Sequence, residues 1–262
     1  METPQESQFA QHEVLPEEKL ESASSFSTRL TNVFAGPDEL FTELIVQPVK
    51  TTSWLIPLIC SILLACGFTW VLFSNPTLRD QMMESQRQEM QKKVASGDMT
   101  QEQADKASEM MSGDSIIIKA FGAAAASAVA AIAFFVLPLI LFGAAKFALH
   151  YDGKYFKVLE LYGLLSLIGF VGGVVAMIMI LGLNTLYASP SAALAVLGNY
   201  DRHNTLHNLL ASLNVFTLWE TAIIGMGLAK FSKRPAMHGM GLVFALWAIW
   251  AVFSSLMGWG MK

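Results

Sequence analysis

The chain has 262 residues, of which 53% are hydrophobic and 15% are charged, and its mean hydropathy is +0.46. Soluble domains of this size are less apolar and more highly charged, so the composition excludes an ordinary soluble globular protein and indicates a membrane protein. The formal net charge is −4. The excess negative charge lies at the N-terminus, because residues 1–30 contain six glutamates and two basic residues.

The first residues of the chain are rich in Glu, Gln and Ser and poor in apolar side chains. Such a segment cannot bury enough apolar surface to offset the entropy lost on ordering. It also lacks the basic start and apolar core of a secretory signal. We therefore predict a disordered acidic tail over residues 1–31 and a membrane domain over residues 32–262.

A short amphipathic helix is expected just before the first apolar run, within VFAGPDELFTELIVQPVK. Pro37 suits a first helical turn, acidic and apolar residues take opposite sides, and Pro48 ends the pattern. Two placements are open. The helix lies on the membrane surface, or it packs on the protein's own loops.

Five apolar runs are long enough to cross about 30 Å of hydrocarbon with ~20 residues each. They cover residues 54–73, 118–145, 158–183, 209–229 and 240–259. The predicted fold class is therefore all-α, a polytopic membrane bundle of five transmembrane helices. The odd number of spans puts the two termini on opposite sides of the membrane.

The polar stretch of residues 75–113 lies between the first two spans. Asn75 before a proline is typical of a helix start, Gly97 of a helix end, and Thr100 with Gln103 of a capping box. We predict an extramembrane helical hairpin here. Its regularly spaced methionines either pack between the two helices or form an adaptable docking surface.

Orientation follows from the basic residues of short loops. One side carries Lys50, Lys146, Lys154, Lys157, Lys230, Lys233 and Arg234, and the other carries Arg202 and Lys262. This bias predicts a cytoplasmic N-terminus. The hairpin opposes it, because it adds basic residues to the outer side, where they alternate with acids.

Small residues are placed for close helix packing. Spans in lipid associate through close backbone approach, and Gly169, Gly173 and Gly225 suit that role. Packing within one bundle and a dimerisation face are both compatible with the spacing. The loop residues Lys230, Lys233 and Arg234 are candidate contacts for anionic lipid, at ~1 kcal/mol each.

Glu220 is the candidate site residue, because an ionisable group inside a span is costly and normally faces the protein interior. Asn214, Thr217 and Thr221 share its sector and make an intramembrane polar cluster with it. No second acid or histidine falls at the same depth. We weigh a packing or hydrogen-bonding role against proton or ion transport.

Catalytic and metal-binding signatures are not apparent. His203 and His207 have the i, i+4 spacing of zinc ligands, but no third ligand follows except Asp201, so we interpret them as the polar start of a helix. Cys60 and Cys66 fall in one apolar run and are expected to act as small hydrophobes without a disulfide. We expect no cofactor and no metal. An enzyme would have to build its site from separate helices.

Several stretches together resemble a known family. These are VFAGPDELFTELIVQP before WLIPLI, the turn YDGKYFKVLELYG, the SPS at residues 189–191, and NVFTLWETAIIGMGLAK. They resemble the prokaryotic branch of the Yip family of Ypt/Rab-interacting membrane proteins over residues 32–260, with the hairpin as an insertion. Asn214 stands where the family commonly has Asp, and Glu220 where an apolar residue is expected.

The resemblance implies a five-span protein of the cell (inner) membrane with a cytoplasmic N-terminus. It also implies membrane organisation or protein interaction without catalytic chemistry. The expected partners are the lipid bilayer and either other proteins or a second copy of the chain, and no nucleic acid. The Asp-Leu-Tyr-Gly-Pro motif of eukaryotic relatives is not recognisable, so no GTPase partner is inferred. The alternative function is a small transporter or proton-coupled channel that uses Glu220.

Overall fold

The computed structural model describes residues 24–112 and 116–257. These residues are helical apart from loops and one isolated β-bridge. In chain order the elements are α1 (Phe26–Ala35), α2 (Pro37–Val46), α3 (Thr52–Ser74), α4 (Pro76–Ala95), α5 (Gln101–Ser112), α6 (Ile116–Ala144), η1 (Ala145–Leu149), α7 (Tyr155–Leu183), η2 (Ala192–Asn199), α8 (Thr205–Ser212), α9 (Val215–Phe231) and α10 (Ala236–Leu256). The predicted all-α class is confirmed for this part of the chain.

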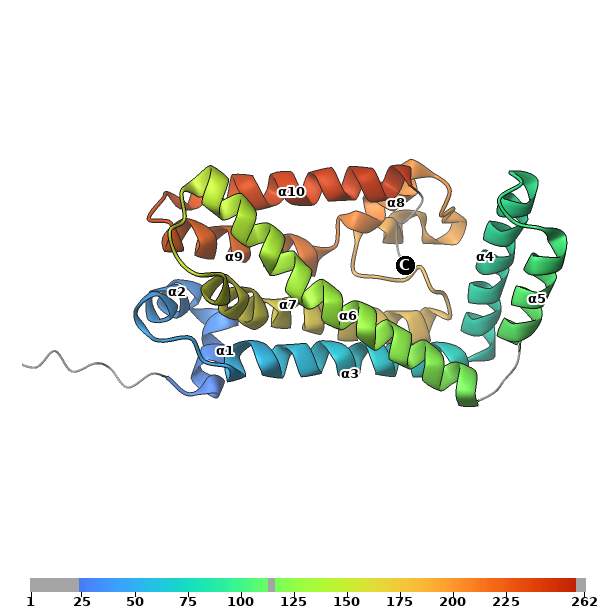
Figure 1. Cartoon of the computed structure of the whole chain (residues 1–262), viewed down its shortest axis with the longest axis horizontal. Helices are drawn as coiled ribbons and strands as arrows, with labels where there is room; N and C mark the ends of the chain where they lie inside the picture. The colour runs from blue at the N-terminus through green and yellow to red at the C-terminus, as the bar shows by residue number, and fades with distance from the viewer. Residues whose placement is uncertain (1–23, 113–115, 258–262) are drawn as a thin grey trace, which may run out of the picture.

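Four helices are long and apolar enough to cross a membrane: α3, α6 with the π-helical turn η1, α7 and α10. They correspond to four of the five predicted spans, and α6 crosses the others obliquely (Figure 1). Their outer surfaces expose large apolar side chains such as Leu63, Val129, Ile178 and Ile249. Such a surface is suited to lipid, and the protein is a multi-pass integral membrane protein.

The remaining predicted span, residues 209–229, is divided into α8 and α9. Asn214 separates the two helices, because its backbone is extended and its side-chain oxygen caps α9. That oxygen accepts hydrogen bonds from the backbone N–H groups of Phe216 at 2.9 Å and Thr217 at 3.4 Å. The apolar pattern of the sequence continues through the break, so the cap residue Asn214 is the one sequence feature that indicates where α9 begins.

The backbone around this break is paired with the SPS segment that follows α7. Val215 N donates to Pro190 O at 3.1 Å, and Ala192 N donates to Leu213 O at 3.2 Å. These bonds satisfy polar groups that the interrupted helix leaves open. Two of the stretches that carry the family resemblance are therefore neighbours in space.

Glycines set the closest helix contacts. A Cβ at Gly239 of α10 would lie only 2.0 Å from the carbonyl oxygen of Gly225 in α9. A Cβ at Gly163 of α7 would lie 2.7 Å from the Cα of Trp54 in α3. Both pairs of helices thus meet backbone to backbone.

The helix α1 begins at Phe26, before the boundary predicted at residue 31, and its residues Arg29 and Val33 are buried. Residues 1–23 lie outside the described residues. The predicted amphipathic helix is present as α2, and its buried residues Leu40, Phe41 and Leu44 belong to the main core. Of the two placements, packing on the protein itself is the one observed.

The helices α4 and α5 lie at the opposite end of the molecule from α1 and α2 (Figure 1). The predicted caps are confirmed: Asn75 accepts from Leu78 N at 3.3 Å, and Thr100 N donates to the Gln103 side chain at 3.0 Å. Gly97 has a left-handed φ of 81°. The polar side chains of α4 bind the loop after α7, as shown by the bond from Gln81 to Asn184 O at 2.9 Å.

Candidate functional site

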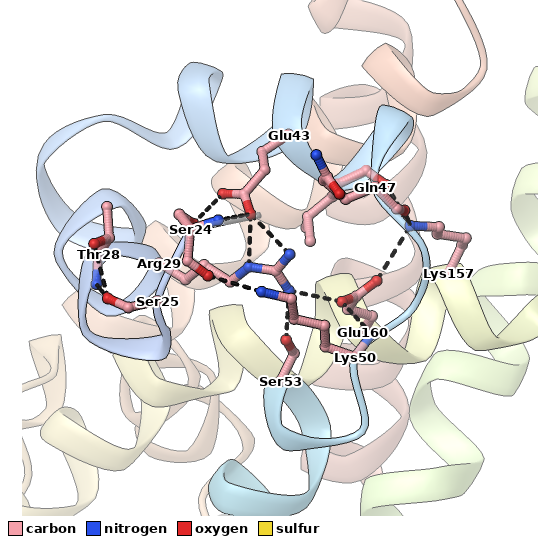
Figure 2. Close-up of polar contacts among 11 residues, drawn as sticks. Ser24, Ser25, Thr28, Arg29, Glu43, Gln47, Lys50, Ser53, Lys157 and Glu160 are labelled. Atoms are coloured by element: carbon pink, nitrogen blue, oxygen red, sulfur yellow. Dashed lines mark hydrogen bonds and ion pairs between the residues drawn. The ribbon is translucent and has the colours of Figure 1, made fainter. Parts of the chain in front are cut away.

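A buried ionic cluster joins the two N-terminal helices to the end of the bundle (Figure 2). Its centre is Arg29 of α1, whose side chain is 1% exposed. The guanidinium donates to Glu43 of α2, to Ser53 of α3 and to Glu160 of α7. The nitrogen–oxygen distances are 2.8 Å to each glutamate and 2.7 Å to Ser53. One side chain thus ties together four helices.

Two lysines complete the cluster. The Nζ of Lys157 donates to Glu160 at 3.3 Å and to the backbone oxygens of Leu44 and Gln47 at the end of α2. A cation there also complements the negative end of the helix dipole. The backbone N–H of Lys50 donates to Glu160 at 2.9 Å, so the fully buried carboxylate is held by three neighbours.

In the cluster Arg29 and Lys157 face Glu43 and Glu160, and the ammonium group of Lys50 is a third cation that donates to Ser24 O at 2.8 Å. Burial alone would raise the pKa of Glu43. Hydrogen bonds from Ser24 and Arg29, together with the Arg29 charge, outweigh burial and hold that pKa below its ordinary value of 4.5. The cluster is a structural clamp in which each of the two carboxylates is paired with a cation, rather than a group of free acids.

Sequence reasoning missed this cluster. Arg29 falls in the acidic tail by composition, and Glu43 matches the polar face of an amphipathic helix. The available signal was Glu160, an acid inside an apolar helix near its start, which requires a nearby cation. Local spacing offered Lys157, but nothing in the pattern pointed to Arg29, 131 residues away.

The predicted polar cluster around Glu220 is only partly assembled. The side-chain oxygen of Asn214 caps α9 and has no hydrogen bond to Glu220 among the described residues. Thr217 is exposed, and Thr221 is buried. Among residues 24–112 and 116–257, no hydrogen bond is recorded from Thr217 or Thr221 to the Glu220 carboxyl. Ser166, a buried polar residue of the neighbouring helix α7, donates to Gly163 O of its own helix at 2.7 Å.

Glu220 instead faces a glycine of the neighbouring helix. A Cβ at Gly169 of α7 would lie 2.5 Å from Oε2 of Glu220, so the carboxyl occupies the space that this glycine leaves. Gly173 leaves space for Leu64 of α3, and Gly225 for the backbone of Met240 in α10. The three predicted packing glycines therefore each lie at a contact between different helices.

The basic residues at the end of α9 and in the loop that follows it are partly engaged within the protein. Lys230 pairs with Asp38 at the start of α2. Arg234 donates to Leu149 O and to Nδ1 of His150, both at 3.5 Å. Lys233 is exposed and has a left-handed φ of 53°.

His203, in the loop before α8, contacts α4, whereas His207, in α8, contacts that loop. His203 lies 3.0 Å from the Nζ of Lys92, and Nδ1 of His207 accepts from Asp201 N at 2.9 Å. The part of the chain that the structure describes contains no group of three potential metal ligands. Both cysteines are free thiols, and the Sγ of Cys66 lies 3.0 Å from the Ser127 hydroxyl.

Comparison with known proteins gives one match. No curated protein and no solved structure matches the chain significantly. The family model described as the Yip1 domain matches residues 31–260. This range covers all the membrane helices and begins just after Arg29, so the main cation of the ionic cluster falls outside it while Glu43, Ser53 and Glu160 fall inside. The chain belongs to the Yip1 domain family.

Proposed function

We propose that the protein is a non-catalytic scaffold of the cell (inner) membrane that holds binding helices at its cytoplasmic face. The ionic cluster carries this proposal. It fixes α1 and α2 on the end of the bundle through Arg29, whereas a helix that served only as a linker would need no buried charges. The same pair of helices leaves Phe34 and Val46 exposed at 38% and 67%, which suits contact with another protein, a second copy of the chain or lipid.

The proposed topology has five crossings with a cytoplasmic N-terminus. The 17 residues of α9 make a helix of about 26 Å, close to the ~30 Å of the hydrocarbon core. With α9 counted as a crossing, Lys50, Lys157, Lys230 and Arg234 share one side of the membrane, as the positive-inside rule requires. Lys230, Lys233 and Arg234 then lie at the level of the lipid head groups.

Site-specific crosslinking in native membranes tests the scaffold. A photoreactive residue at Val46 should give a discrete adduct with another protein or with a second copy, and one at the lipid-facing Ile178 should give none. Repeating the Val46 reaction in the Arg29→Ala background should abolish the adduct, because α1 and α2 are then no longer fastened. The absence of any protein adduct from Val46 and Phe34 would reject the scaffold.

Transport through Glu220 is the second candidate, and the placement of its carboxyl against Gly169 favours it, since a carboxyl facing a neighbouring helix can bind an ion or a proton. The nine residues from Glu160 to Gly169 span ~14 Å of α7. No hydrogen bond among the described residues bridges the carboxyl of Glu220 to the ionic cluster. That separation supports the scaffold over a proton pathway from Glu220 to the ionic cluster.

Two substitutions separate the candidates. Glu220→Gln keeps hydrogen bonding but cannot ionise, so a transporter should lose activity while its amount in the membrane stays unchanged. Glu220→Leu should be tolerated by a scaffold, because it removes a carboxyl that has no hydrogen-bond partner among the described residues and so relieves the free-energy cost of burying it. Ion or proton flux into proteoliposomes and the amount of folded protein are the two measurements.

A further inference from the structure

A pocket of about 320 Å³ lies at the end of the bundle that carries α2. It is formed by the end of α2, by the turn between η1 and α7 together with the start of α7, and by the end of α9 with the loop that follows. The pocket is separate from the centre of the ionic cluster, although Lys157 lines both. None of the functions considered above uses the pocket.

The polar groups of the pocket favour an anion. Lys233 contributes an exposed ammonium group that has no hydrogen-bond acceptor among the described residues. Arginine has only donors, so Nδ1 of His150 accepts from Arg234, and the neutral ring then carries its proton on Nε2 as a second donor. Asp152 is the single acid that lines the pocket, and it opposes an anion.

Ser232 supplies the observation that points to a missing ligand. This residue lines the pocket, and its buried hydroxyl has no hydrogen-bond partner among residues 24–112 and 116–257. A buried hydroxyl without a partner costs free energy, so such groups normally meet a protein atom, a water or a ligand. An oxyanion in the pocket would accept hydrogen bonds from Lys233 and His150, and from Ser232 once rotation about its Cα–Cβ bond turns the buried hydroxyl towards the pocket.

The backbone of the pocket adopts an unusual form to place these groups. His150 and Lys233 both have left-handed φ values, 57° and 53°, which non-glycine residues seldom adopt. Gly153 is required because a Cβ there would lie 2.1 Å from the Tyr151 hydroxyl oxygen. Tyr151 then stacks on Phe231, with ring centroids 6.2 Å apart. Burial raises the pKa of Tyr151 to about 12, so this wall remains neutral.

The surroundings of the pocket indicate a lipid rather than a soluble anion. Ile45, which lines the pocket, is 47% exposed. Phe147, three residues before His150, is 89% exposed, and Met237, four residues after Lys233, is 74% exposed. Basic donors bordered by exposed apolar side chains match the boundary between head groups and acyl chains.

We infer that this pocket binds the phosphoryl head group of an anionic phospholipid, with Lys233, His150 and Ser232 as donors and Ile45, Phe147 and Met237 against the acyl chains. The inference uses the proposed placement of this end of the bundle at head-group level. It does not depend on the scaffold role, and loss of the Val46 crosslink would leave it untouched.

Native mass spectrometry of the full chain in a neutral detergent, titrated with phosphatidylglycerol, tests the inference. Lys233→Ala should weaken binding about fivefold, as expected for one basic residue at a membrane surface. Asp152→Asn should strengthen it, because the only opposing charge is removed. Ser232→Ala should weaken binding without lowering the melting temperature of the lipid-free protein, since its hydroxyl has no partner to lose. Lys106→Ala, a variant of the distant α5 helix, should bind as the unmodified protein does.

Three outcomes would overturn the inference. Equal binding of phosphatidylcholine would show that head-group charge is not recognised. Unchanged affinity in both Lys233→Ala and Asp152→Asn would place the lipid elsewhere. Inorganic phosphate that binds as tightly as phosphatidylglycerol would identify a soluble anion as the ligand and remove the lipid from the inference.

Discussion

Arg29 and Glu160 meet at 2.8 Å with exposed fractions of 1% and 0%, although 131 residues separate them in the chain. Each ion compensates for the burial of the other, so removal of Arg29 deprives Glu43 of its ion pair and leaves Lys157, at 3.3 Å, as the remaining cation beside the fully buried Glu160. Arg29→Ala should therefore lower the free energy of unfolding by about 3–5 kcal/mol. Thermal unfolding in detergent measures this change.

An exposed ion pair is the matched control for that prediction. Lys106 and Glu102 form an i, i+4 pair in α5 with exposed fractions of 70% and 78%. Surface pairs of this kind contribute well under about 1 kcal/mol. Lys106→Ala should leave the melting temperature nearly unchanged, and equal effects of the two substitutions would contradict the clamp role of Arg29.

Acid should loosen the N-terminal helices through Glu43. The folded-state pKa of Glu43 lies below 4.5, so its ionised form stabilises the fold above about pH 4.5, and this contribution is lost as the pH falls through the lowered folded-state pKa. Proteolysis within α1 and α2 should accelerate on acidification below pH 4.5 relative to the rest of the chain.

Glu43→Gln is the control for this pH dependence. The amide cannot ionise, so the variant should be destabilised at neutral pH and should show a weaker response to acid. If both proteins respond identically to acid, the titration belongs to another group.

The apolar helices could be predicted from the sequence because lipid imposes a length and a composition on each span. Residues 54–73 and 158–183 match α3 and α7 closely for that reason. The division of residues 209–229 could not be predicted in the same way, because Leu209, Leu210, Ala211 and Leu213 continue the apolar run towards α9 and the break depends on pairing with the SPS segment. The position of Arg29 depends on contacts with three other helices, which no local pattern encodes.

The Glu220 carboxyl illustrates the same limit at a candidate site. The sequence shows that an ionisable group lies inside a span, where burial costs free energy, and that α7 has small residues. The placement of the Glu220 carboxyl against Gly169 depends on how α7 and α9 pack. Sequence periodicity gives the face of a helix and not the residue that lies opposite.

Asn214 should be replaceable by aspartate but not by alanine. Its side-chain oxygen accepts two backbone hydrogen bonds at the start of α9, and a carboxylate can do the same. Asn214→Ala should cost about 0.5–2 kcal/mol of stability, whereas Asn214→Asp should retain it. Hydrogen exchange of the Phe216 and Thr217 amides reports the cap directly, and equal protection in both variants would show that the cap is dispensable.

Gly239 and Gly241 offer a matched test of close helix packing in α10. A Cβ at Gly239 would lie 2.0 Å from the Gly225 carbonyl oxygen, a backbone atom that cannot move aside alone, whereas a Cβ at Gly241 would meet nothing within 4 Å. Gly239→Ala should force α9 and α10 apart and lower the melting temperature. Gly241→Ala should be neutral or stabilising by up to about 1 kcal/mol, because alanine favours the helix. Thermal unfolding of the two variants in the same detergent compares them directly, and a Gly239→Ala protein as stable as Gly241→Ala would refute the backbone contact between α9 and α10.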